Sequence, residues 1–302
     1  MTTDLRFAYG TNGFADHRLT DALHVLADLG YQGVSLTLDH HHLDPYVPDT
    51  ADQLGRVQKT LAATGLAVVV ETGARYLLDP WRKHRPTLLT ADKADRARRQ
   101  DLLRRAIDIA SELGAECVHL WSGTPDPQDL PDDGGVDDLW RRLADGIARL
   151  LPAAEAAGLD LAFEPEPGML VADRAGYRRL TGLLGKPDRL RLTLDIGHCR
   201  CLEPLPVPAC VRASAADLAH VQIEDMRRGV HEHLPFGEGE IDFPPVLRAL
   251  ADVGYRGLVS VELPRHNHAA TELARRSLEF LRTTQQQAHQ LPPQQPREAV
   301  ST

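Results

Sequence analysis

Short apolar runs alternate with longer amphipathic segments along most of the chain, which predicts strands and helices in turn. The apolar runs predict eight β-strands, over residues 5–10, 33–38, 66–71, 115–120, 159–164, 190–195, 219–224 and 257–262. Between and after them, apolar residues recur at helical spacing. These segments predict helices over residues 17–29, 50–64, 92–113, 137–157, 174–184, 208–217, 243–253 and 268–282.

Glycines mark the helix ends and show that the chain is built from a repeated unit. They stand where a C-terminal helix cap belongs, just before a strand, at Gly30, Gly65, Gly114, Gly158 and Gly254. The segment ADLGYQGV at 27–34 is nearly repeated as ADVGYRGL at 251–258. Helix, glycine and strand therefore form one recurring element.

Regular alternation of strand and helix, with right-handed crossovers, predicts a parallel sheet. Eight such units fit a single closed (βα)₈ TIM barrel over residues 1–282, of the α/β class. An open doubly wound sheet is the alternative. It is disfavoured because no helix opens with a glycine-rich phosphate-binding motif; GTNG at 10–13 is not G-x-G-x-x-G.

Two segments depart from the repeat. Residues 72–94 form a long stretch after the third strand, on the face where barrel enzymes carry their active sites, so a lid and an ordinary solvated loop are both open. Residues 283–302 are rich in Gln and Pro without an apolar period, which predicts a disordered tail.

Composition narrows the class of protein. The chain has 302 residues, 42% hydrophobic and 25% charged, an ordinary globular balance. A net charge of -9 without a basic block argues against nucleic acid as a partner. No apolar run approaches the roughly 20 residues of a membrane span, and the start, MTTDLRF, has no secretory pattern. We therefore expect a cytoplasmic protein with no membrane partner.

The four cysteines are Cys117, Cys199, Cys201 and Cys210, too few and too unevenly spaced for a disulfide framework. Cys199 and Cys201 follow His198 and would suit a soft metal. No second cysteine pair stands at zinc-site spacing, however, and buried thiols are the commoner case.

The segment LRLTLDIGH at 190–198 first suggests chemistry. It predicts a strand that stops at Asp195 and presents His198 three residues later. A carboxylate and an imidazole together suit a divalent cation. A strand end with an Asx turn at Asp195 and a surface His198 is the alternative.

Other strands end in the same way. In a barrel the carboxyl ends of all strands meet at one face. The polar groups there are Asp39 with His40, His41 and His42, then Glu71, His119, Glu164, Asp195 with His198, Glu224 and Glu262. So many carboxylates and imidazoles in one cleft require a cation or shifted pKa values.

Five motifs carry a family resemblance: FEPEPG at 163–168, LDIGH at 194–198, HVQIED at 220–225, HLPFGEGEID at 233–242 and GLVSVE at 257–262. In order and spacing they resemble the xylose isomerase-like TIM-barrel superfamily, over roughly residues 5–282. That group includes ketose 3-epimerases, hydroxypyruvate isomerases, inosose isomerases and dehydratases, and apurinic-site endonucleases.

The resemblance implies a site for one divalent metal ion, with Mn²⁺ expected and Mg²⁺, Co²⁺ or Zn²⁺ as alternatives. The implied ligands are Glu164, Asp195, His220 and Glu262, of which Glu164 and Glu262 also serve as catalytic acid and base. Substrate contacts are implied for His198, Glu166, Arg227, Glu71 and His119. His220 starts its strand, so a buried structural histidine is the alternative there, and Arg227 lies one residue further along than the family's arginine.

The resemblance further implies an isomerase or epimerase of a keto-sugar, cyclitol or related polyol, and barrels of this type often form homodimers. Proton transfer at the carbon next to a metal-polarised carbonyl would carry the reaction. The alternatives are a dehydratase of the same superfamily, a multi-zinc phosphodiester hydrolase with His231 and His233 as extra ligands, and a metabolite-binding barrel that binds metal without turnover. Glu224 stands where many members have lysine, which disfavours an anionic substrate unless Arg75, Lys83 or Arg227 compensates.

Overall fold

Eight parallel strands close into a barrel, as predicted, in a computed structural model that describes residues 4–130 and 135–292. Around the barrel the order is β1-β10-β7-β6-β5-β4-β3-β2. The strands are β1 (Arg6–Gly10), β2 (Gly33–Thr37), β3 (Ala67–Glu71), β4 (Cys117–Trp121), β5 (Asp160–Glu164), β6 (Leu190–Asp195), β7 (Leu218–Ile223) and β10 (Leu258–Val261). The α/β TIM barrel expected from the sequence is confirmed.

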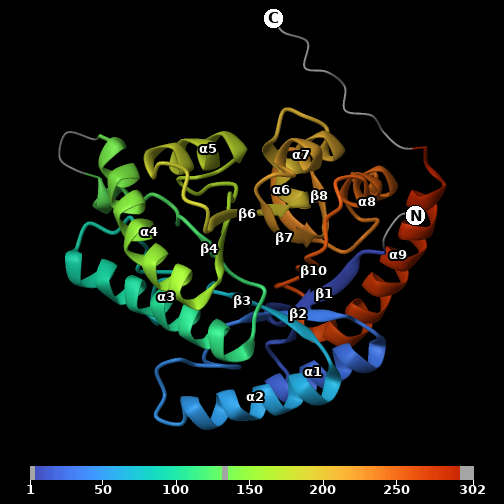
Figure 1. Ribbon diagram of the computed structural model, residues 1–302, viewed down its shortest axis with the longest axis horizontal. Helices are drawn as coiled ribbons and strands as arrows, with labels where there is room; N and C mark the ends of the chain where they lie inside the picture. The colour runs from blue at the N-terminus through green and yellow to red at the C-terminus, as the bar shows by residue number, and fades with distance from the viewer. Residues whose placement is uncertain (1–3, 131–134, 293–302) are drawn as a thin grey trace, which may run out of the picture.

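The helices form a ring outside the strands (Figure 1). They are α1 (Leu19–Leu29), α2 (Thr50–Thr64), α3 (Lys93–Leu113), α4 (Asp137–Ala157), α5 (Arg174–Leu183), α6 (Ile196–Leu202), α7 (Val207–Ser214), α8 (Phe243–Asp252) and α9 (Ala270–Gln290), with short 3₁₀ turns at Thr11–Phe14, Pro127–Asp129 and Asn267–Ala269. Four of the predicted glycine caps end α1 to α4 in the left-handed conformation, at Gly30, Gly65, Gly114 and Gly158.

The core has two layers because successive strand residues face opposite sides. Outward residues such as Phe163 and Leu194 join the helices in one large cluster. A separate small cluster fills the barrel interior with Ala8, Val69, Cys117, Ala162 and Leu258. Closer to the carboxyl ends of the strands, the inward-facing residues are polar. The functional groups therefore lie directly above the small apolar cluster that fills the barrel interior.

Two elements were not predicted. Helix α6 follows β6 without a loop, and its few residues carry no separate apolar period. Strands β8 (Asp225–Arg227) and β9 (Val230–Leu234) form an antiparallel hairpin after β7, outside the barrel. The hairpin sequence is rich in charged residues and histidine, so hydrophobic patterning did not reveal it.

The prediction that disorder begins at residue 283 is wrong for the first part of the tail, because α9 continues to Gln290. Leu281, Thr284 and Ala288 recur at helical spacing and are buried. In addition, Gln285 Oε1 accepts a hydrogen bond of 2.8 Å from the amide of Leu5. The glutamine-rich end of α9 therefore still has a buried apolar stripe, as an ordinary amphipathic helix does. Residues 293–302 of the predicted tail lie outside the described residues.

The helical extension makes a testable prediction. Ala288 is 1% exposed, whereas the neighbouring Gln287 is exposed. Ala288→Glu should lower the free energy of unfolding by about 2 kcal/mol or more, because it buries an unpaired charge. Gln287→Glu, the matched control, should change it by less than about 0.5 kcal/mol in urea denaturation. Equal, small effects would mean that the helix does not pack there.

The long connection after β3 is confirmed, since no helix or strand occurs between Glu71 and Lys93. It is nevertheless packed: Ala74 and Leu78 form a small apolar cluster with Leu102 of α3. No helix among the described residues is long and apolar enough to cross a membrane.

Candidate active site

A cavity of about 420 Å³ opens at the carboxyl ends of the strands, a volume in the usual range for small-molecule sites. Acidic and imidazole groups form much of its wall. Of the predicted site residues, it is lined by Glu71, His119, Glu164, Glu166, His198 and Glu262. The barrel therefore brings side chains from five strand ends into one cleft.

Glu164 is fixed by two histidines. Its Oε2 lies 2.6 Å from His119 Nε2, and its Oε1 lies 3.2 Å from His198 Nδ1. Burial alone would disfavour its charge, but these imidazoles outweigh that effect and hold the pKa of Glu164 well below its usual range. The same contacts outweigh burial at His119 and raise its pKa. Glu164 is therefore a carboxylate at neutral pH.

Asp195 is the last residue of β6 and the N-cap of α6, and its two carboxylate oxygens have different surroundings. Its Oδ1 accepts a 2.7 Å hydrogen bond from the amide of His198, so it caps α6. Its Oδ2 is buried without a hydrogen-bond partner. One oxygen thus makes the turn of the Asx alternative, and the other is free to bind a ligand.

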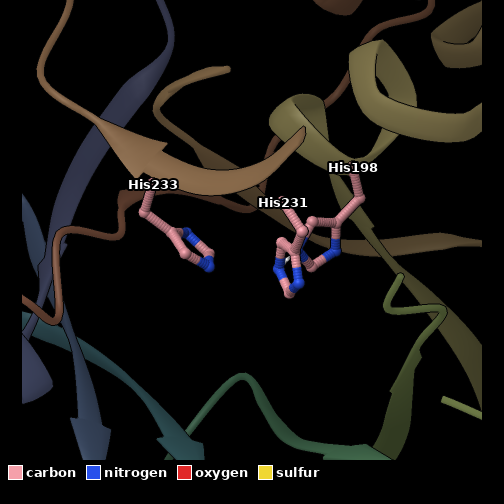
Figure 2. A group of neighbouring side chains, drawn as sticks. All are labelled: His198, His231 and His233. Atoms are coloured by element: carbon pink, nitrogen blue, oxygen red, sulfur yellow. Dashed lines mark hydrogen bonds between the residues drawn. The ribbon is translucent and has the colours of Figure 1, made fainter. Parts of the chain in front are cut away.

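Three histidines gather on one wall (Figure 2). His198 comes from α6, and His231 and His233 come from β9. The Nε2 atoms of His198 and His231 are 3.0 Å apart, so one ring must donate and the other accept. Burial and the nearby His198 lower the pKa of His231 to about 4. Asp195 and Glu164 outweigh burial and raise the pKa of His198, so His198 is the favoured donor and the neutral His231 the acceptor.

Glu224 and Glu262 add acidity beside these histidines. Glu224 follows β7 and is fully buried, and neither carboxylate oxygen has a hydrogen-bond partner. A Cβ on Gly197 would lie 2.0 Å from Glu224 Oε1, so glycine at this position leaves the space that the Glu224 carboxylate occupies. Burial first, and then Asp195, raises the pKa of Glu224. Burial likewise raises the pKa of Glu262, whose Oε1 accepts a 2.9 Å hydrogen bond from Asn12.

These groups fit a divalent cation. Ligand atoms of Asp195, Glu224, His233 and Glu262 all lie within 4.8 Å of one another, as do those of Glu164, Asp195 and His198. Buried oxygens of Asp195 and Glu224 lack hydrogen-bond partners. Such crowded acceptors need a positive charge, and oxygen-rich sets with imidazole suit Mn²⁺-class ions. No cysteine belongs to any such group among the described residues, and all four cysteines are buried.

The structure does not bring His220 into this cluster. His220 lies deeper in the barrel, fully buried, with Nε2 2.9 Å from Ser260 Oγ and 3.3 Å from Ser35 Oγ. Burial lowers its pKa to about 3. Its position at the amino end of β7 places it below the strand ends. The alternative of a buried structural histidine describes what is seen.

Arg227 also lies away from the cavity. It is on β8, where it makes a 3.2 Å ion pair with Glu232 across the exposed side of the hairpin. Its neighbours Asp225 and Met226 are buried while Arg227 is exposed. The extra residue noticed in its spacing thus turns this side chain toward solvent rather than toward a substrate.

Sequence reasoning missed Gln222 and underrated His233. Gln222 Nε2 donates a 3.2 Å hydrogen bond to Glu71, which leaves its Oε1 buried and unpartnered. It pairs with Asp195 across the sheet. The signal was available, because Gln222 lies midway between His220 and Glu224 and must share their inward face. His233 required knowledge that the hairpin folds back over the cavity.

A sequence model of the protein family described as "Xylose isomerase-like TIM barrel" matches residues 23–284 of this chain. The chain belongs to this family. The match spans the strand ends of the site, from β2 through β10. It confirms the resemblance that the five motifs carried.

Members of the xylose isomerase-like family with known activities are similar to this chain. L-Ribulose-5-phosphate 3-epimerase of Escherichia coli strain K12 is 27% identical over 232 residues, covering 75% of this chain and 78% of its own. The expected class of enzyme, a sugar isomerase or epimerase, is thereby confirmed at that coarse level.

Solved structures of this family share the fold. An L-ribulose 3-epimerase superimposes with a TM-score of 0.74 at 23% identity, covering 95% of this chain and 96% of its own. A 3-keto-D-glucoside 4-epimerase from E. coli reaches 0.74 at 16% identity, with coverages of 93% and 100%. At these identities the likeness supports the barrel and leaves the substrate to the site itself.

Proposed function

We propose that this protein is a metal-dependent 3-epimerase of a keto-sugar. The observation that carries the proposal is a pair of glutamates, Glu164 and Glu262, which line one cavity from strands separated by β6 and β7. Inverting a carbon next to a carbonyl requires one group to remove a proton and another to deliver one to the opposite face. The names of the similar epimerases support the same chemistry.

The surroundings of the two glutamates suit these roles. The histidines around Glu164 keep it ionised, so it removes the proton from the substrate carbon. Burial raises the pKa of Glu262, so this carboxyl group accepts a proton more readily than Glu164 does. In the reverse direction the roles exchange, and no electron is gained or lost overall. Carboxylates whose pKa values are driven apart are the usual sign of an acid and base pair.

Asp195, Glu224, His233 and Glu262, with Glu164 beside them, would hold the cation. When bound, it polarises the substrate carbonyl and acidifies the adjacent C–H. The chain's own groups fix the geometry: Asn12 donates to Glu262, and His119 and His198 position Glu164. We place Glu166 and Glu71 as contacts for sugar hydroxyls, because both line the cavity.

Proton exchange tests this proposal directly. Purified protein supplied with Mn²⁺ and L-ribulose 5-phosphate or L-ribulose in D₂O should introduce deuterium at C3 and form the xylulose epimer, as followed by NMR. Removal of metal with a chelator should stop both processes, and added Mn²⁺ should restore them. Absence of C3 exchange across a panel of ketoses and inososes would contradict the epimerase.

One observation favours a second candidate, the multi-zinc phosphodiester hydrolase. Ligand nitrogens of His198, His231 and His233 lie within 4.8 Å of one another, which would suit a further zinc ion. Against it, β3 ends on Glu71 rather than on a histidine. Metal counting separates the two: near three zinc ions per chain would favour the hydrolase, and one Mn²⁺-class ion the epimerase.

A further inference from the structure

Three cationic side chains line the same cavity as the acidic groups, and the epimerase chemistry does not use them. Arg75 and Lys83 come from the connection after β3, and Arg265 from the segment after β10. Strands β1 and β2 separate these two connections around the barrel. Cations therefore reach the cavity from two sides.

The connection after β3 is folded so that Arg75 and Lys83 lie at its neck. The amide of His84 donates a 2.5 Å hydrogen bond to the carbonyl of Arg75, and His84 Nδ1 lies 2.7 Å from the carbonyl of Gly73. Ala74 and His84 both have positive φ, at 47° and 65°, an arrangement that non-glycine residues rarely adopt. The neck thus holds the two cations beside one another.

Arg75 is further anchored by contacts at the cavity edge. Its Nε lies 3.4 Å from Asp39 Oδ2, and its guanidinium donates a 2.7 Å hydrogen bond to the carbonyl of Asn12. Asp39 is 3% exposed, so this anchor lies beneath the surface. The contacts fix the guanidinium at the cavity edge.

Lys83 and Arg265 differ from most surface cations of this chain. Exposed arginines elsewhere pair with nearby carboxylates, as Arg105 does with Asp101 and Arg275 with Glu272. Among the described residues, neither Lys83 nor Arg265 makes a hydrogen bond or ion pair. Burial first, and then the charges of Arg75 and Arg265, lowers the pKa of Lys83.

We propose that Arg75, Lys83 and Arg265, here called the cationic rim, bind an anionic group, phosphoryl or carboxylate, on the substrate. Three like charges, two of which have no counter-ion, favour an anion, and charge-assisted hydrogen bonds would hold it. The ionised Glu164 repels the same anion from the acidic part of the cavity. The sugar therefore enters in one orientation, with its anion at the rim and its carbonyl end toward the glutamates.

The inference about sugar orientation rests on the proposed epimerase, whereas the affinity for an anion does not. The rim also bears on Glu224, an acidic residue that disfavours an anionic substrate. The positive charges of the rim compensate for this acidic residue, whereas Arg227 lies away from the cavity and does not. Glu224 is fully buried and does not line the cavity, whereas the three rim cations do, so an anion can bind at the rim without approaching Glu224.

Unreactive probes test the rim without requiring turnover. Isothermal titration would compare ribitol 5-phosphate, ribonate and ribitol, none of which has the ketone that epimerisation requires. We expect at least one anionic probe to bind about tenfold or more tightly than ribitol. The tighter of the two identifies the group as phosphoryl or carboxylate. Equal affinity of all three probes would overturn the proposal.

Variants locate the effect. Lys83→Gln combined with Arg265→Gln should remove most of the preference for the anionic probe, because the two rim cations without a counter-ion are lost and the remaining Arg75 is paired with Asp39. Arg82→Gln is the matched control: Arg82 is on the same connection, pairs with Asp79 at 2.7 Å and does not line the cavity, so the preference should remain. A preference that survives the double variant would refute the rim.

The two proposals can fail separately. If the anionic probe is preferred but no ketose exchanges its C3 proton, the rim stands and the epimerase does not. If ketoses are epimerised but the three probes bind equally, the epimerase stands and the rim does not. Both side chains are exposed, so the double variant should fold, which circular dichroism would verify.

Discussion

Glu164→Gln and Glu262→Gln should each lower kcat for epimerisation by about 10²- to 10⁴-fold, the usual contribution of a general acid or base. Glutamine keeps the size of the side chain and removes the group that exchanges protons. Turnover would be measured by coupled assay or by NMR, with circular dichroism to show that each variant is folded.

The two variants should fail in different ways, and this difference is the sharper test. With Glu262 replaced, Glu164 can still remove and return the proton of one epimer, so that epimer should exchange with D₂O without inversion. With Glu164 replaced, exchange should survive only for the other epimer. If both variants lose exchange of both epimers equally, the glutamates do not act on opposite faces.

A distant glutamate controls for general effects of the substitution. Glu155 is on α4 and makes a 3.0 Å ion pair with Arg189 at the surface. Glu155→Gln should leave kcat and the exchange pattern unchanged. A comparable loss in that variant would show that the effect of the site variants is not specific.

Asp195→Asn should abolish retention of the metal ion while keeping the fold. An asparagine oxygen can still accept the hydrogen bond from the amide of His198, so the cap of α6 is preserved. The charge beside Glu224 and Glu262 is lost. Metal content after dialysis, measured by mass spectrometry, should fall from near one ion per chain to near none.

His220→Ala should give the opposite result. The metal should remain, because His220 belongs to none of the groups of converging ligand atoms. The free energy of unfolding should fall by about 1–3 kcal/mol, because the buried hydroxyls of Ser35 and Ser260 lose a partner. Loss of metal in His220→Ala as well as in Asp195→Asn would support the ligand set first expected from the sequence.

The fold could be predicted from the sequence because each strand and each helix leaves a local pattern of apolar residues. A strand buried on both faces is a short apolar run, an amphipathic helix has a stripe, and a glycine such as Gly158 ends the helix wherever it stands. Parallel connection then places every strand end at one face. Glu164, Asp195 and Glu262 could therefore be assigned to one site before any coordinates were known.

Other assignments failed where the outcome depended on elements that meet only in space. His220, Gln222 and Glu224 all face the inside of the barrel along β7 and just beyond it, but they lie at different distances from the carboxyl ends of the strands. The alternation of residues predicts which face a side chain takes and does not predict how deep in the barrel it lies. His233 reaches the cavity through a hairpin with little hydrophobic signal. The length of α9 depends on Ala288 and its neighbours packing against the barrel, which their glutamine-rich surroundings concealed.

The sequence by itself determined the barrel, the family and the chemical types of the groups at the strand ends, because these follow from periodicity and from short motifs. Only the tertiary structure decided which of those groups face one another. Two histidines keep Glu164 ionised, and the Glu224 side chain has room beside α6 because residue 197 is glycine. Contacts of this kind join residues far apart in the chain. No local pattern records them, since each is fixed by how the strands, helices and hairpin pack together.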